Sequence, residues 1–95
     1  MKFKKSFVNK KTFKRRAKKC HICGEKRYHL LDVHRWKIPG SENGKYEISN
    51  CICVCANCHR LIHADEIKII GIFESTKGKL LNYFDKNNNE QFNQI

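Results

Sequence analysis

The stretch that decides the fold is "CANCHRLIH", residues 55–63, in which a CxxC pair is followed at once by two histidines. A second pair, "CHIC", occupies residues 20–23. Two such pairs can close a tetrahedron of thiolates around one zinc ion, and the binding energy of a closed site of this kind stabilises the fold. We therefore predict a structural zinc ion held by Cys20, Cys23, Cys55 and Cys58.

Two further cysteines leave the ligand assignment open. Cys51 and Cys53 lie on the same face of a predicted strand as Cys55, because side chains two residues apart point the same way. Either could replace Cys55 as a ligand, or both could be buried as small apolar residues. The short turn to Cys58 favours Cys55, and His21 is a further substitute ligand.

The chain has 95 residues, which is enough for one small domain that needs a metal or disulfides to stabilise its core. No apolar run approaches the length of a membrane span, and no apolar segment follows the basic N-terminus. We therefore expect no membrane segment and no signal peptide. The six cysteines then lie in the reducing cytoplasm, where thiols bind metals.

The net charge of +11 is concentrated at the N-terminus. Residues 1–19 contain ten of the 20 Lys and Arg residues and no acid, which leaves 10 basic and 9 acidic residues, a balance of +1, in the remainder. This block predicts a basic arm that binds a nucleic-acid backbone through counterion release, although a solvated tail has the same composition. The residues that we assign to nucleic acid are Lys10, Lys11, Lys14, Arg15, Arg16, Lys18 and Lys19.

Hydrophobic patterning divides the rest of the chain. The pattern of apolar positions in residues 20–64 predicts a strand, a loop, a second strand and a helix. The strands are "YHLLDVH" and "ISNCICVC", and the helix is "ANCHRLIHAD". The loop contains Pro39, Gly40 and the pair Asn43-Gly44. In the arm, a weak helical stripe runs through Phe3, Phe7, Phe13 and Ala17.

Beyond this middle, residues 65–84 predict a hairpin around the turn "TKG", and Gly71 indicates a bulge or a close approach of two backbones. The exposed edges of such a hairpin could bind a protein partner. Residues 85–95 form a polar tail that we expect to fray, because it offers little apolar surface to bury.

Three histidines predict a second metal site. His59 and His63 lie at i and i+4, so both imidazoles project from one face of the predicted helix. Two histidines can fall at this spacing by chance. However, the CxxC pair at residues 55–58, the zinc knuckle, places the start of the helix beside His59 and brings the strand that ends at His34 within reach. Three imidazoles without a fourth protein ligand leave positions open for water and phosphate, as in catalytic sites.

The run "CxxC … LDVHR … PG … N … CxxCHRLIH" resembles the HNH nucleases, which are common among phage and homing endonucleases. The resemblance covers residues 20–63. It implies a small α+β fold, a ββα-metal (His-Me finger) core stapled by a four-cysteine zinc site, here with a basic arm and a C-terminal hairpin. It also implies hydrolysis of phosphodiester bonds, most commonly in double-stranded DNA, with 5′-phosphate and 3′-hydroxyl products. The catalytic cation would be Mg²⁺, Mn²⁺, Ni²⁺ or Zn²⁺, and a phage-encoded chain would act in the cytosol of its bacterial host.

By position, the resemblance assigns the cation to His34, His59 and His63, and it makes Asn50 either a cation ligand or a residue that pins the loop between the strands. The family has a histidine as proton acceptor directly after the strand ligand, where this chain has Arg35. A guanidinium stays protonated and cannot act as a general base. A shift of the alignment by one residue would instead make His34 the base.

Three interpretations of Arg35 stay open. Another group, such as His29, Asp32 or a metal-bound hydroxide, activates the water. Alternatively, Arg35 clamps the phosphate and catalysis is slow, or the fold binds nucleic acid without catalysis inside a larger phage or ribonucleoprotein assembly. We expect Arg35, Trp36 and Arg60 to grip the nucleic acid near the cleft, although Trp36 could instead pack on the body of the domain.

Overall fold

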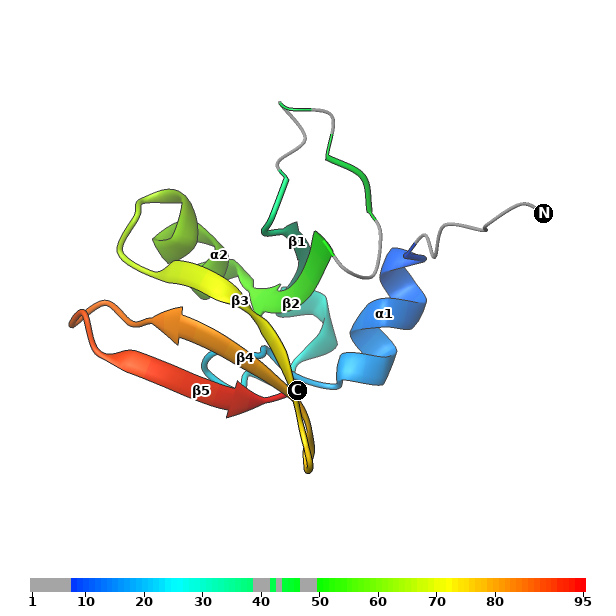
Figure 1. The fold of residues 1–95 in the computed structure, drawn as a ribbon. Coiled ribbons are helices and arrows are strands. Elements are labelled where there is room, and N and C mark those ends of the chain that lie inside the picture. Colours follow the sequence, from blue (N-terminus) through cyan, green and yellow to red (C-terminus); the bar gives the residue numbers. More distant parts are fainter. Residues whose placement is uncertain (1–7, 39–41, 43, 47–49) are drawn as a thin grey trace.

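The computed structural model describes residues 8–38, 42, 44–46 and 50–95 and shows a small α+β fold (Figure 1). Its elements form two antiparallel sheets, one of order β1-β2 and one of order β3-β4-β5. The predicted strands, the predicted helix after Cys55 and the predicted hairpin are all present. In chain order the elements are α1 (Lys10–Ala17), the 3-10 turn η1 (Tyr28–Leu30), β1 (Leu31–Arg35), β2 (Cys51–Cys55), α2 (Ala56–His63), β3 (Lys68–Ser75), β4 (Gly78–Phe84) and β5 (Glu90–Gln94).

The two-stranded sheet lies between the two helices, with α2 on one side and α1 on the other (Figure 1). Every residue of β2 is buried, which explains its continuous apolar sequence "CICVC". The helix α2 begins directly after β2, because the Cys55 thiol accepts a hydrogen bond from the backbone N–H of Cys58 at 3.4 Å and thus caps the helix. The zinc knuckle predicted from the CxxC spacing therefore also starts the helix that carries the histidines.

The helix α1 occupies part of the predicted basic arm and packs on the core. Asn9 caps it by accepting a hydrogen bond from the N–H of Thr12, and Lys18 ends it in the left-handed conformation, with φ 66°. Phe13 and Ala17, one turn apart, contact the core. The other two residues of the predicted helical stripe, like Pro39, Gly40 and Asn43 of the predicted loop, lie outside the described residues.

The bulge predicted at Gly71 is confirmed. The register of β3 against β4 shifts between Ile69 and Gly71. A Cβ atom at position 71 would lie 3.6 Å from the Phe73 ring and 3.9 Å from the Trp36 ring, which are ordinary van der Waals distances, so both rings lie against the strand at the bulge.

The expectation that residues 85–95 fray is wrong, because β5 pairs with β4 along its whole length and turns the predicted hairpin into a three-stranded sheet. Asp85 closes the turn: its carboxylate accepts hydrogen bonds from the N–H groups of Asn87 and Asn89, both at 2.9 Å. Composition predicted fraying because it measures apolar burial, whereas this strand is held by the backbone ladder and by side-chain amides. Within the described part of the chain, no helix has the length and apolar character needed to cross a membrane.

Candidate metal centres

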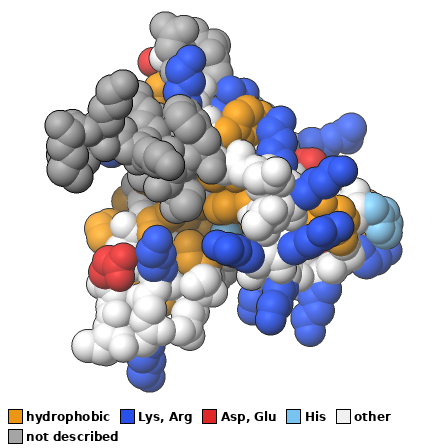
Figure 2. Space-filling view, turned by 90° about the vertical axis from the view of Figure 1, so that its right-hand side faces the viewer, with side chains coloured by type: hydrophobic (Ala, Val, Ile, Leu, Met, Phe, Trp, Pro, Cys, Tyr) orange, Lys and Arg blue, Asp and Glu red, His pale blue; other side chains and the backbone are white. Residues whose placement is uncertain are grey.

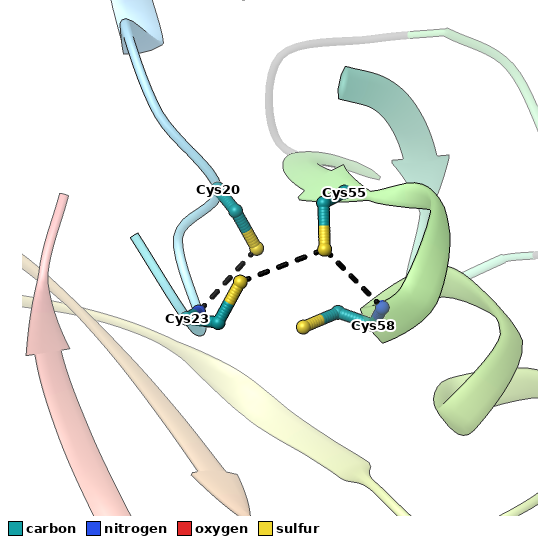
Figure 3. Close-up of side chains that lie close together, drawn as sticks. All are labelled: Cys20, Cys23, Cys55 and Cys58. Carbon is teal, nitrogen blue, oxygen red and sulfur yellow. Dashed lines mark hydrogen bonds between the residues drawn. The ribbon is translucent and has the colours of Figure 1, made fainter. Parts of the chain in front are cut away.

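Four cysteine thiols meet at one point beside the two-stranded sheet. Cys20 and Cys23 come from the turn after α1, and Cys55 and Cys58 come from the end of β2 and the first turn of α2 (Figure 3). All four sulfur atoms lie within 4.8 Å of one another, and those of Cys23 and Cys55 are 3.5 Å apart. A tetrahedral zinc site with Zn–S bonds of about 2.3 Å has sulfur atoms about 3.8 Å apart, so the cluster has the dimensions of such a site.

The electrostatics of this cluster also suit a cation. The pKa of Cys20 falls to about 4, because Cys58 donates a hydrogen bond to its thiolate and backbone N–H groups of the knuckle add to this. The same hydrogen bond raises the pKa of Cys58 well above its ordinary value. A thiol proton thus bridges sulfur atoms that a divalent cation would hold as thiolates. The residues present therefore fit a structural zinc ion, as the CxxC spacing predicted.

The remaining cysteines and His21 belong to the scaffold. Cys51 and Cys53 are 2% and 0% exposed and lie outside the cluster of four, in agreement with the alternative that they are small buried residues. Burial raises the pKa of Cys53 to about 12. His21 Nδ1 accepts a hydrogen bond from the Cys53 N–H at 3.1 Å, and burial lowers the pKa of His21 to about 4, so this imidazole is a neutral structural partner of β2.

The second cluster contains the three predicted histidines, His34 from β1 and His59 and His63 from α2. Their ligand nitrogens all lie within 4.8 Å of one another, and the Nε2 atoms of His59 and His63 are 3.1 Å apart. His34 is partly buried and His63 is exposed, so the cluster opens to solvent on the side of α2. Burial lowers the pKa of His34 to about 4, and its proximity to His59, His63 and Arg35 adds to this, so its imidazole stays in the neutral form that binds metals.

This geometry fits one transition-metal cation. Metal–nitrogen bonds of about 2.0–2.1 Å put neighbouring ligand nitrogens about 3.0–3.4 Å apart, and the two α2 histidines match that spacing. Three neutral imidazoles favour the later divalent metals of the first row. A pocket beside the cluster is lined by Asp32, Ala56, His59, Arg60, His63 and Ala64, so a phosphate could reach a cation held there.

A family model described as HNH endonuclease matches residues 20–65, which include β1, β2, α2 and both clusters. Residues 20–65 are therefore similar to an HNH domain. Such a domain indicates a nuclease or a nucleic-acid-binding function and supports the fold class predicted from the sequence. Searches of curated proteins and of solved structures find no match to the chain.

Asn50 lies directly before β2 and pins the loop between β1 and β2. It is buried, with 6% of its surface exposed. Its Oδ1 accepts hydrogen bonds from the N–H groups of Lys37 and Ile38 at 2.9 and 2.7 Å. Its Nδ2 donates to the carbonyl oxygens of Ile38 and Lys45 at 2.8 and 2.9 Å. Both ends of the amide thus bind backbone groups. Of the two alternatives for Asn50, this contact pattern fits the residue that pins the loop and not the cation ligand.

Arg35 points away from the imidazoles, because neighbouring residues on a strand face opposite sides. Its guanidinium lies 4.2 Å from the centre of the Tyr46 ring and donates to the carbonyl oxygen of Gly44 at 3.3 Å. Lys10 Nζ lies 4.2 Å from the same ring. Arg35 therefore connects the loop and α1 to the sheet, and the structure does not bring it to the cation site.

Two other residues assigned to nucleic acid have structural contacts. Trp36 packs on the core and its ring lies beside Gly71, as the alternative prediction held. Lys14 donates to the carbonyl oxygen of Leu31 at 3.2 Å and so ties α1 to β1. The other assigned side chains are exposed, and Lys and Arg gather on the face of the molecule that contains α1 (Figure 2). They are Lys10, Lys11, Arg15, Arg16, Lys18, Lys19 and Arg60.

One contact of the histidine cluster was missed by the sequence reasoning, which considered Asp32 only as a possible proton acceptor. Asp32 lies on the same face of β1 as His34, two residues away, and its Oδ2 is 3.3 Å from His59 Nδ1. The period of two residues along the predicted strand was the signal that could have placed Asp32 beside the cluster.

Proposed function

We propose that this HNH domain is a metal-dependent endonuclease that hydrolyses phosphodiester bonds in double-stranded DNA and leaves 5′-phosphate and 3′-hydroxyl ends. The observation that carries the proposal is the cluster of His34, His59 and His63, which offers three ligands on one side of a cation and opens to solvent on the other. When bound, Mg²⁺, Mn²⁺, Ni²⁺ or Zn²⁺ would supply positive charge for the scissile phosphate and the leaving oxygen.

The residues around the cluster have separate tasks in this proposal. The three imidazoles hold the cation, and exposed Arg60 at the edge of the pocket attracts the phosphate. The exposed basic residues of α1 contact the DNA backbone without reading its sequence. Arg35 takes no proton, since it is a permanent cation that stacks on Tyr46. We therefore expect slow cleavage, because a missing general base typically costs ~10²–10⁴ in rate.

A plasmid-nicking assay tests this function. With Mg²⁺, Mn²⁺ or Ni²⁺, the wild-type chain should convert supercoiled DNA to nicked circles, and a chelator should stop the reaction. His59→Ala should lower the rate at least about 100-fold through loss of a ligand. The matched control is Asn57→Ala, which removes an exposed side chain of the same helix outside the histidine cluster and should leave the rate unchanged. Equal loss in both variants, or no cleavage by the wild type in any metal, would contradict the proposal.

Arg35→His adds information on the missing base. If the imidazole reaches the water, the variant should cleave faster than the wild type. A wild type that is silent and gains cleavage through this substitution is a disabled nuclease, which would favour the second candidate function over the first.

That second function is non-catalytic binding of nucleic acid within a larger phage or ribonucleoprotein assembly. It is favoured by the engagement of Arg35 with Tyr46 and by the basic exposed face of α1. It predicts salt-sensitive binding that Lys11→Ala and Arg15→Ala weaken while His59→Ala leaves it unchanged. The proposed compartment is the cytoplasm, and the edges of the β3-β4-β5 sheet are the proposed surface for a protein partner.

A further inference from the structure

The contact between Asp32 and His59 sets the hydrogen-bonding state of a proposed cation ligand. Asp32 Oδ2 lies 3.3 Å from His59 Nδ1, and the opposite ring nitrogen, Nε2, lies 3.1 Å from His63 Nε2. The carboxylate therefore contacts the nitrogen that faces away from the cluster. Because an ionised carboxylate can only accept a hydrogen bond, its partner Nδ1 must carry the proton.

This arrangement leaves the lone pair of His59 on Nε2, the nitrogen that lies 3.1 Å from His63 Nε2. A histidine that binds a metal through one nitrogen commonly donates its second N–H to a carboxylate, which fixes the tautomer and the orientation of the ring. Asp32 is well placed for this task because β1 holds it on the same face as His34. Its side chain is 48% exposed, against 28% for His59, so the carboxylate approaches the ring from the solvent side.

We propose that Asp32 is a positioning residue for the cation site: it holds His59 in the Nδ1–H tautomer with Nε2 directed at the cation. The inference rests on the proposed function in that it assigns a cation to the histidine cluster, but it does not require cleavage. It differs from the interpretation in which Asp32 takes the proton of the attacking water, because a carboxylate that accepts the His59 N–H acts through that ligand.

The experiment compares Asp32→Ala and Asp32→Asn in protein that carries one zinc ion per chain, so that the cysteine cluster is filled and the histidine cluster stays free. The asparagine keeps an oxygen that can accept from His59 but cannot act as a base, whereas the alanine removes the acceptor. The matched control is Asp65→Asn, which removes the same charge from an exposed position just beyond α2. Three quantities are measured. Calorimetry gives the affinity for Ni²⁺, and His59→Ala identifies the part of the heat that comes from the histidine site. ¹⁵N NMR gives the tautomer of His59 before Ni²⁺ is added, and plasmid nicking gives the rate of cleavage.

For a positioning residue, Asp32→Ala should weaken Ni²⁺ binding by about 10–100-fold and reduce the population of the Nδ1–H tautomer. Asp32→Asn should show a smaller loss, and saturating Ni²⁺ should restore nicking in both variants. The wild-type affinity and tautomer in Asp32→Ala would overturn the inference. If Asp32→Asn binds Ni²⁺ with the wild-type affinity but no longer nicks DNA, the inference is also overturned, and Asp32 acts instead as the base that takes the proton of the water. A wild type that binds Ni²⁺ and shows the Asp32-dependent tautomer without any nicking supports the inference and contradicts the proposed nuclease.

Discussion

Asn50 holds the loop between β1 and β2 by hydrogen bonds at both ends of its amide. Its burial means that water cannot replace these partners. At the residue scale, an asparagine at this position could be a cation ligand or a residue that holds the loop, and only its four hydrogen bonds distinguish these roles.

Asn50→Ala should therefore destabilise the fold by about 1–3 kcal/mol, since it removes four partly buried hydrogen bonds that hold the loop. Urea unfolding followed by circular dichroism measures the loss. Asn57→Ala is the control, because Asn57 is exposed on the first turn of α2. Unchanged stability of Asn50→Ala together with reduced affinity for the catalytic cation would favour the ligand role instead.

At the scale of elements, β5 connects the C-terminal sheet to the zinc knuckle. The side-chain amide of Asn93 donates to the carbonyl oxygens of His21 and Ile22, at 3.0 Å each, and to the hydroxyl oxygen of Tyr83 at 3.0 Å. The carbonyl groups belong to the turn that carries Cys20 and Cys23. The strand that composition predicted to fray thus holds the turn of a metal site.

Asn93→Ala should consequently destabilise the knuckle by about 1–3 kcal/mol, because it removes the donor for two carbonyl groups. Faster transfer of zinc to a competing chelator would report the loss. The control is Gln94→Ala, which changes the next residue of β5, an exposed one, and should alter zinc release much less. A larger effect of Gln94→Ala than of Asn93→Ala would argue that Asn93 does not connect β5 to the zinc knuckle.

The element α1 shows how charge and packing divide within one short helix. Phe13 and Ala17 face the core, Lys14 binds the carbonyl oxygen of Leu31, and Lys11 and Arg15 are exposed. A count of charges could not separate these groups, because the orientation of the helix follows from its docking on β1.

At the scale of the whole molecule, the four-cysteine cluster connects three parts of the chain: the turn after α1, the end of β2 and the start of α2. The buried apolar core is small and itself contains cysteines. A zinc ion bound by this cluster would stabilise a domain of this size strongly, because structural zinc contributes about 10–16 kcal/mol and small domains are stable by only about 5–15 kcal/mol.

Removal of zinc by a chelator should therefore unfold the chain at room temperature, with loss of the circular dichroism of α2 and the sheets. Cys58→Ser should reduce zinc content below one ion per chain, measured by atomic absorption. Cys51→Ser changes a buried thiol outside the cluster of four and should keep one zinc ion. Equal zinc loss in the two variants would mean that the ligand set has been misassigned.

The amino-acid sequence by itself determined most of the elements, with β5 as the exception, and it placed the cysteines and the histidines in two groups, because these features depend on local spacing. The CxxC pairs identify the thiol cluster, the i, i+4 pair of His59 and His63 follows from the helical repeat, and Gly71 marks the bulge in β3. Each of these signals lies within a few residues of the chain.

Tertiary structure decided which polar groups meet. The partner of His59 is Asp32, that of Arg35 is Tyr46 and that of the knuckle is Asn93, and each pair joins different elements. The sequence left several uses open for each of these side chains, since their hydrogen-bonding capacity can be satisfied in many ways. Docking of α1, α2 and β5 on the two sheets selects one partner for each, because the packing of these elements decides which complementary atoms lie within hydrogen-bonding distance.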